Sequence, residues 1–275
     1  MLPEILNYSF FQNALMGSLL VSICSGILGT YIVSRRLVFI SGGITHASFG
    51  GLGLGFFAGI NPVITAMVFA VLSAFGVEWL AKKHSVREDS AIAVFWALGM
   101  ALGIIFIFMT PGFAPSLTEY LFGNILTITR ADLYWFGLFT VILCLFVVLF
   151  LRYIVVVAFD PEFAKVQRLP VRIIEYTMMC FIAISIVLTI RMIGIVLLMS
   201  VITLPQMIAG IHAHNFRKIM IWSVFNCMLG CFSGLFLSYY LNVPAGACIV
   251  FVLVLFYIAG KSIRYLRDNF AGQRQ

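Results

Sequence analysis

Charged side chains are scarce in this sequence: they make up only 10% of its 275 residues, whereas 63% are hydrophobic. A soluble globular protein has about 25% charged residues, so the composition excludes a mostly water-exposed chain. Instead, apolar runs of about 18–25 residues follow one another, and this length crosses a bilayer as a helix. The sequence therefore predicts an all-α, polytopic transmembrane helical bundle of about eight to nine spans. The runs cover residues 10–33, 38–60, 62–81, 90–109, 133–151, 173–190, 192–210, 218–240 and 244–260.

Enzyme motifs are also missing from the sequence. Neither HExxH nor GxSxG occurs, which excludes the zinc-protease and serine-hydrolase signatures that these motifs mark. The segment "AGKS" at 259–262 matches the end of a phosphate-binding loop, but Leu255 replaces the first glycine of that motif. We therefore expect that the chain is not an enzyme, binds no cofactor of its own and does not hydrolyse ATP by itself.

Basic residues gather at alternate ends of the apolar runs. Because cytoplasmic loops carry the excess of lysine and arginine, this pattern predicts an outer N-terminus and a cytoplasmic C-terminus, with Arg130 and Arg191 as exceptions. The net charge of +7 follows from this bias and requires no nucleic-acid partner. Little polar sequence lies outside the runs, so we expect a single transmembrane domain over residues 1–275. The cytoplasmic clusters are Arg35–Arg36, Lys82–Lys83–Arg87, Arg152 to Arg172, Arg217–Lys218 and Lys261–Arg264–Arg267.

Two connections between the runs are long. Residues 110–132 contain prolines and a semi-apolar stretch, which predicts an outer loop with a short interfacial or re-entrant helix. Residues 152–172 are the longest charged stretch on the cytoplasmic side. There Asp160 is placed to cap a short helix with Pro161 at its first position, and Pro170 ends it. A short amphipathic helix under the membrane is a surface to which a partner protein can bind.

The run at 38–60 contains a histidine among many glycines. Small residues at every fourth position let two membrane helices approach closely, and one such stripe comprises Gly43, Ala47, Gly51, Gly55 and Gly59. A neighbouring stripe comprises Gly42, His46 and Gly50. His46 is therefore expected beside a close-packing seam, about 12 Å from the cytoplasmic end of its helix.

A polar side chain at this depth normally faces the bundle interior or a water-filled path. His46 is thus either a ligand on a transport path or a packing residue that bonds a backbone carbonyl across a tight helix crossing. The surrounding glycines leave space and exposed carbonyls, which favours the first reading.

Glu88 and Asp89 stand just before the run at 90–109. They either cap that helix and favour its positive end, or they form an acidic ligand pair for a divalent cation near an inner mouth. They are expected roughly one to two helical turns nearer the cytoplasm than His46. One of the two segments would have to be broken or displaced for all three side chains to bind one ion.

Six segments, taken in order, resemble one family over nearly the whole chain. It is the family of membrane permease subunits of zinc/manganese-type ATP-binding-cassette importers. The resemblance implies an importer in the bacterial cytoplasmic membrane, with two permease copies or paralogues, two ATPase subunits below and an extracytoplasmic metal-binding protein. The segments are "SRRLVFISGGITHASFGG", "REDSAIAVFWALGMALG", "YLFGNILTITRADL", "AFDPEFAKVQRLPV", "MIGIVLLMSVITLPQMIAG" and "LSYYLNVPAGACIV".

The resemblance also assigns roles to individual residues. His46 matches the family's metal-path histidine, with Gly42 and Thr45 adjacent; Gly42 stands where the family normally has an aspartate. The loop at 152–172 matches the coupling loop that contacts the ATPase, through Asp160, Glu162, Lys165 and Arg168. Arg168 occupies a place usually held by glycine.

Imidazole suits zinc well and manganese or iron acceptably, and a missing carboxylate disfavours a hard ion. The sequence therefore favours zinc as the transported ion, with manganese or iron next. Two other functions stay open at this point. One is an ATP-driven permease for an iron chelate or corrinoid, and the other is a stand-alone channel or secondary carrier.

Overall fold

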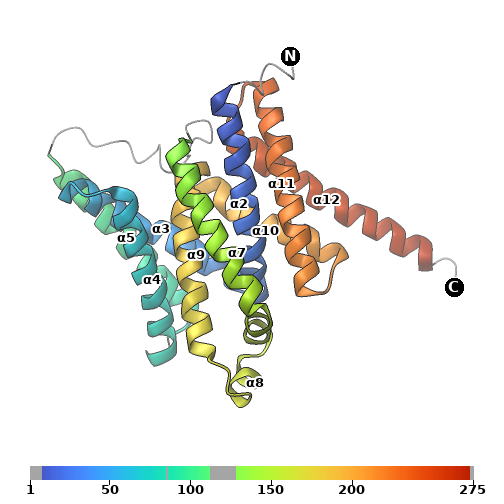
Figure 1. Ribbon diagram of the computed structural model, residues 1–275, viewed down its shortest axis with the longest axis horizontal. Coiled ribbons are helices and arrows are strands. Elements are labelled where there is room, and N and C mark those ends of the chain that lie inside the picture. Colours follow the sequence, from blue (N-terminus) through green and yellow to red (C-terminus); the bar gives the residue numbers. More distant parts are fainter. Residues whose placement is uncertain (1–7, 85, 112–127, 273–275) are drawn as a thin grey trace. The chain divides into compact units, whose positions relative to one another are not determined.

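The computed structural model describes residues 8–84, 86–111 and 128–272, and within these ranges the chain is helical and has no strand. The predicted all-α fold is confirmed, and each apolar run falls on its own helix (Figure 1). The ten helices are α2 (Ser9–Ser34), α3 (Val38–Ala58), α4 (Pro62–His84), α5 (Glu88–Met109), α7 (Arg130–Phe159), α8 (Pro161–Val166), α9 (Val171–Ile193), α10 (Ile195–His212), α11 (Phe216–Leu241) and α12 (Ala245–Gly272).

Seven of these helices are long and apolar enough to cross a membrane: α2, α4, α5, α7, α9, α11 and α12. The apolar part of α10, Leu197–His212, is shorter, and α3 is outside the seven because glycine and polar residues interrupt its apolar sequence. The count agrees roughly with the expected eight to nine spans. The chain is a multi-pass membrane protein.

The chain divides into two compact units. Unit 1 comprises residues 1–33, 124–141 and 196–275, and unit 2 comprises residues 34–123 and 142–195. Unit 2 contains α3, α4, α5, α8 and α9, and unit 1 contains α11 and α12 with nearly all of α10.

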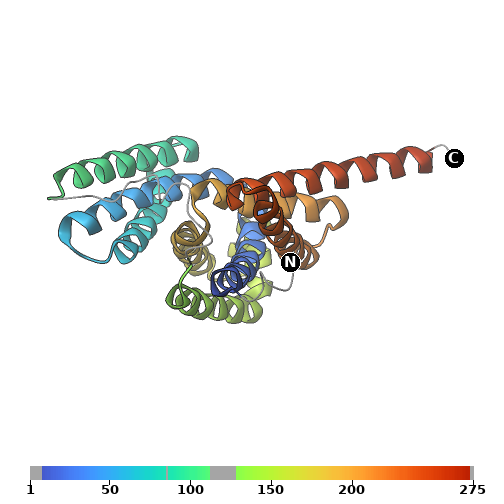
Figure 2. The same ribbon diagram turned by 90° about the horizontal axis from the view of Figure 1, so that it is seen from above.

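In unit 2, α3 packs against both α4 and α5, and the three helices lie side by side (Figure 2). Most of α3 is buried although six of its first ten residues are small or polar, because neighbouring backbones occupy the space that larger side chains would fill. α4 and α3 also contact α9, where the Phe75 ring meets Tyr176 edge-on with centroids 5.2 Å apart. The core of this unit is therefore built around the helix that carries His46.

In unit 1, α11 and α12 form an antiparallel pair, since Gly230 faces Leu253 and Gly234 faces Ile249. Asn242 ends α11 in the left-handed conformation (φ 54°), which asparagine tolerates better than most residues. The side-chain amide of Gln206 in α10 donates to the carbonyl of Ser25 in α2 at 2.6 Å. Such hydrogen bonds help hold membrane helices together where apolar contact with lipid is equally favourable.

The connection at 110–132 lies mainly outside the described residues, so its expected interfacial or re-entrant helix lies there too. Its last three residues form the first turn of α7, which begins at Arg130.

Candidate functional site

His46 lies within α3, and its ring stacks flat on the indole of Trp96 from α5. The ring centroids are 4.1 Å apart and the planes differ by 9°. Phe49, one turn further along α3, has its ring 6.4 Å away at a similar tilt. The Nδ1 atom of His46 is buried and has no hydrogen-bond partner among the described residues. A carbonyl bond from Nδ1 across the helix crossing, the packing alternative, is not formed in this part of the chain.

The neighbours of His46 on α3 are small and engaged with backbone. Gly42 is buried one turn before it. The hydroxyl of the buried Thr45 donates to the carbonyl of Ser41 at 2.7 Å, and Ser48 donates to the carbonyl of Thr45 at 2.6 Å. The Thr45 hydroxyl therefore donates its hydrogen bond to the helix backbone, and only its oxygen lone pairs remain to bind a cation.

Glycines allow the close approach of α3 and α5. A β-carbon added at Gly103 of α5 would lie 2.6 Å from the carbonyl oxygen of Phe49, and one at Gly99 would meet the backbone of Ala47. One at Gly53 would lie 2.8 Å from the Cα of Gly103. The predicted close-packing seam is therefore confirmed, with α5 as one partner.

The expected stripe serves two helices rather than one. Gly43 and Ala47 face α5, whereas Gly51 and Gly55 face Thr65 and Pro62 of α4. Residues four apart on a helix are displaced by about 40° because 3.6 residues make a turn, so a four-residue repeat drifts around the helix. Gly59 ends α3 in the left-handed conformation (φ 67°) instead of packing against a helix.

Glu88 and Asp89 form the first turn of α5 and are exposed. Asp89 makes only a loose ion pair with Arg87, at 3.8 Å, with both side chains more than 70% exposed. Trp96, which touches His46, follows Glu88 by eight residues, or about 12 Å along the helix. The structure does not bring these carboxylates to His46, and the described residues contain no group of three or more His, Cys, Asp or Glu side chains that could hold a metal ion.

The stretch at 152–172 forms the predicted short helix, α8, between α7 and α9 (Figure 1). The carboxylate of Asp160 accepts a hydrogen bond from the backbone N–H of Phe163 at 2.9 Å, Pro161 occupies the first helical position, and Pro170 caps α9. Glu162 and Lys165 form an exposed ion pair at 2.6 Å.

Arg168 follows α8 with φ of 56°, in the left-handed region that favours glycine. Its N–H bonds the carbonyl of Lys165, and the N–H of Leu169 bonds that of Ala164, so the turn is a helix-ending motif. Arg168 therefore adopts, under strain, a backbone conformation that glycine would adopt without it.

The apolar side chains Phe163 and Val166 of α8 are 51% and 81% exposed, beside the charged Glu162 and Lys165. A helix of six residues that shows both kinds of side chain to solvent is a small amphipathic surface. No sequence signal had singled out these two apolar residues.

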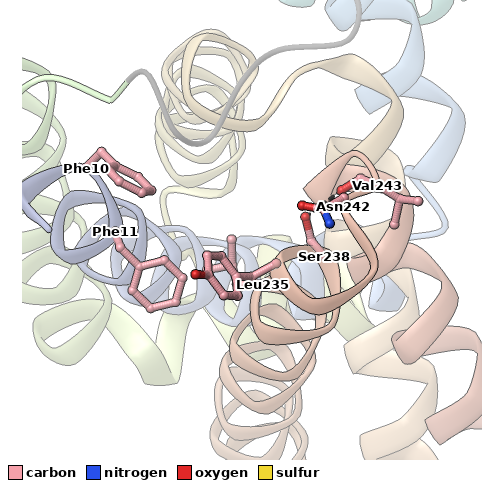
Figure 3. A pocket seen from close by; sticks show the side chains of 7 residues that line it. Phe10, Phe11, Leu235, Ser238, Asn242 and Val243 are labelled. Carbon is pink, nitrogen blue, oxygen red and sulfur yellow. Dashed lines mark hydrogen bonds between the residues drawn. The ribbon is translucent and has the colours of Figure 1, made fainter. Parts of the chain in front are cut away.

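A hollow of about 270 Å³ lies in unit 1 between the start of α2 and the end of α11 (Figure 3). Aromatic and aliphatic side chains line it, together with the polar side chains of Ser238 and Asn242. The hydroxyl of Ser238 donates a hydrogen bond to the carbonyl of Val243 at 2.6 Å. None of its seven lining residues offers a carboxylate, imidazole or thiol. This hollow does not have the donors of a divalent-metal site.

Sequence reasoning missed Trp96, Gly99 and Gly103 as neighbours of the histidine helix. The two glycines are four residues apart in "WALGMALG", which is itself a small-residue spacing. Trp96 gave no signal, because an aromatic residue in an apolar run is usually lipid-facing or core.

A multi-pass helical membrane fold, with a histidine in the tightly packed helix α3 and the short capped helix α8 between two long helices, fits a membrane permease. The profile of the ABC 3 transport family ("ABC-3") matches residues 7–263, and the chain belongs to this family. The resemblance to permease subunits of metal-ion ATP-binding-cassette importers is therefore confirmed, and such subunits are not themselves catalytic.

Individual relatives and a solved structure support the same family assignment. An uncharacterised membrane protein of Synechocystis is 36% identical over 261 residues, covering 95% of this chain and 93% of that protein. The manganese transport system membrane protein MntC of Listeria monocytogenes is 30% identical over 262 residues, covering 94% and 92%. The solved structure of PsaBC from Streptococcus pneumoniae in complex with Fab is similar with a TM-score of 0.84 and 28% identity, covering 94% of this chain and 95% of that chain.

Proposed function

We propose that this chain is the membrane-spanning subunit of an ATP-driven importer for a divalent transition-metal ion, with zinc as the preferred ion and manganese or iron next. The observation that carries the proposal is His46: an imidazole within the tightly packed, glycine-rich helix α3, with a buried Nδ1 that has no partner among the described residues. A buried polar atom without a partner is costly, and a passing metal ion would supply one.

Two lines of support point to different metals. Relatives such as MntC carry the name of manganese transport. The donor set here is an imidazole without the carboxylate expected one turn earlier, since Gly42 has no side chain, and such a set favours the softer zinc ion. The exposed Glu88 and Asp89 would act earlier or later on the path than His46, at the cytoplasmic end of α5.

The proposed assembly contains two permeases, as two copies or two paralogues, in the bacterial cytoplasmic membrane. Two ATPase subunits would bind the cytoplasmic side at α8, through the coupling residues Asp160, Glu162, Lys165 and Arg168. An extracytoplasmic metal-binding protein would deliver the ion, with the loop at 110–132 as its proposed contact. ATP would be bound and hydrolysed by the partner subunits.

Uptake of radioactive zinc and manganese tests this function. Cells lacking their own metal importers would express the permease with its ATPase and binding protein, beside cells with an ATPase that binds but cannot hydrolyse ATP. We expect uptake only with the active ATPase. Uptake without ATP hydrolysis would indicate a channel or secondary carrier, and transport of a chelate or corrinoid in place of either ion would indicate that alternative.

Gly42→Asp is expected to shift the preference from zinc toward manganese by about tenfold, because a carboxylate one turn before His46 adds a hard oxygen ligand. The measurement is competition between the two ions in the uptake assay. Gly42→Asn is the matched control, since it has the same shape without the charge. A shift in neither variant would mean that position 42 is not near the ion, and an equal shift in both would mean that the negative charge does not set the preference.

Val166→Glu and Phe163→Glu are expected to abolish co-purification of the ATPase, because each places a charge in the exposed apolar part of α8. Neither Phe163 nor Val166 caps α8 with its side chain, so the helix should still form in both variants. Asp160→Lys would instead remove the side chain that caps α8. Tyr265→Glu in α12 is the control, since Tyr265 is 68% exposed on the same predicted side of the membrane. Retained ATPase binding in both α8 variants would count against α8 as the docking helix.

A further inference from the structure

Arg35, in the turn between α2 and α3, joins three parts of unit 2. One guanidinium nitrogen, Nη2, lies 2.7 Å from the Oε1 of Glu175 in α9. A second, Nη1, donates to the backbone carbonyl of Val157 near the end of α7 at 3.2 Å. α7 and α9 are the two helices that α8 connects, and Arg35 lies three residues before the start of α3.

The contact with α7 has a cause in the sequence. The carbonyl of Val157 would normally accept from the N–H four residues later, but that residue is Pro161, which has no N–H. Val157 is fully buried, so water does not replace the missing donor. Arg35 supplies it, and the proline that starts α8 therefore creates the acceptor that ties α7 to the start of α3.

The contact with α9 is equally enclosed. The side chains of Arg35 and Glu175 are 20% and 8% exposed, unlike the Glu162–Lys165 pair on α8, whose side chains are more than half exposed. A planar guanidinium can hold a carboxylate and a carbonyl at once in a fixed geometry, which lysine cannot reproduce. Separating a buried charge from its partner is strongly unfavourable. The Arg35 guanidinium, the Glu175 carboxylate and the Val157 carbonyl are therefore expected to move together.

From this arrangement we propose that Arg35 and Glu175 are positioning residues that transmit movement of α8 to α3. This inference rests on the proposed function of α8 as the ATPase-docking helix. When a docked ATPase displaces α8, the end of α7 and the first turns of α9 move with it. Arg35 carries that displacement into the start of α3, and His46 lies eleven residues further along the same connected segment.

The stiffness of α3 supports this route. Its contacts with α5 at Gly99 and Gly103 are backbone against backbone and leave no room for side chains to rearrange. A displacement at the first turn is therefore passed along α3 and α5 as a packed pair, to the stacked rings of His46 and Trp96.

The test is the number of metal ions taken up per ATP hydrolysed, measured on the complex of permease and ATPase reconstituted in proteoliposomes with zinc or manganese. The main variant is the double substitution Arg35→Met with Glu175→Met. Replacing both members of a buried ion pair by apolar residues is often neutral for folding, whereas removing one member alone is not. We expect this variant to keep ATPase binding and hydrolysis but to lose at least about fivefold in ions per ATP, the lower range of couplings between separate sites.

Two further variants sharpen the result. Arg35→Lys keeps the charge opposite Glu175 and is expected to retain more coupling than the double variant. Asp268→Asn is the control, since it removes an exposed ion pair with Arg264 on α12, at 3.6 Å, outside this connection. We expect its ratio to equal that of the wild type.

The outcomes separate the two proposals. If the wild-type chain neither binds the ATPase nor takes up metal, the proposed function fails. If the wild type does both and the double variant keeps the wild-type ratio, the transmitting role of Arg35 and Glu175 is overturned while the function stands.

Discussion

His46→Ala should lower metal uptake by at least about 100-fold, because loss of even an outer partner of a metal ligand costs about 10- to 100-fold. The imidazole is the side chain in the described part of α3 that has a buried nitrogen without a hydrogen-bond partner, and α3 is packed against both α4 and α5. Its ring plane is fixed by Trp96 at 4.1 Å, which blocks one face but leaves the in-plane nitrogens free to bind. Removing it also removes a ring, so a space remains in which an ion finds no donor.

The measurement is uptake of radioactive zinc and manganese at equal membrane expression. His212→Ala is the matched control: His212 ends α10 and is exposed, and its removal is expected to leave uptake unchanged. A His46→Ala permease that transports normally would show that the histidine is a packing residue held by Trp96. In that case Glu88 and Asp89 would become the first positions to test.

Gly103→Ala is expected to destabilise the folded chain by about 1–3 kcal/mol, the usual cost of overpacking. The added methyl would lie 2.6 Å from the carbonyl oxygen of Phe49 and 2.8 Å from its carbon, and a helix backbone cannot move aside as a flexible side chain can. Gly99→Ala meets the backbone of Ala47 and is expected to behave alike. Either change must separate α3 from α5 and so disturb the His46–Trp96 stack.

Thermal unfolding in detergent measures this effect, with Gly137→Ala as the control. Gly137 lies in α7, and a β-carbon there would have no described atom within 4 Å. Since alanine favours a helix over glycine by about 1 kcal/mol, this control should be neutral or stabilising. Equal stability of Gly103→Ala and Gly137→Ala would show that the close approach of α3 and α5 is not required.

Local features were predictable from sequence. Each apolar run lies on its own helix, since about 20 apolar residues in lipid must satisfy their own backbone hydrogen bonds. The Asp160 cap with Pro161 was equally readable, because a cap involves residues only three positions apart. Helix ends were less predictable: α7 continues to Phe159 and α12 to Gly272, beyond their apolar runs. Hydropathy reports the membrane-embedded part of a helix, and a helix can continue past it.

Contacts between distant residues were decided only by the tertiary structure. The sequence alone determined a helical membrane protein with a histidine on a small-residue stripe and a capped short helix in the stretch 152–172. It did not determine that the stripe divides between α4 and α5, or that Trp96 covers the imidazole. It also did not pair Arg35 with Glu175, 140 residues away. Helix formation and capping depend on neighbours within one or two turns, whereas these contacts depend on how the helices rotate and pack against one another.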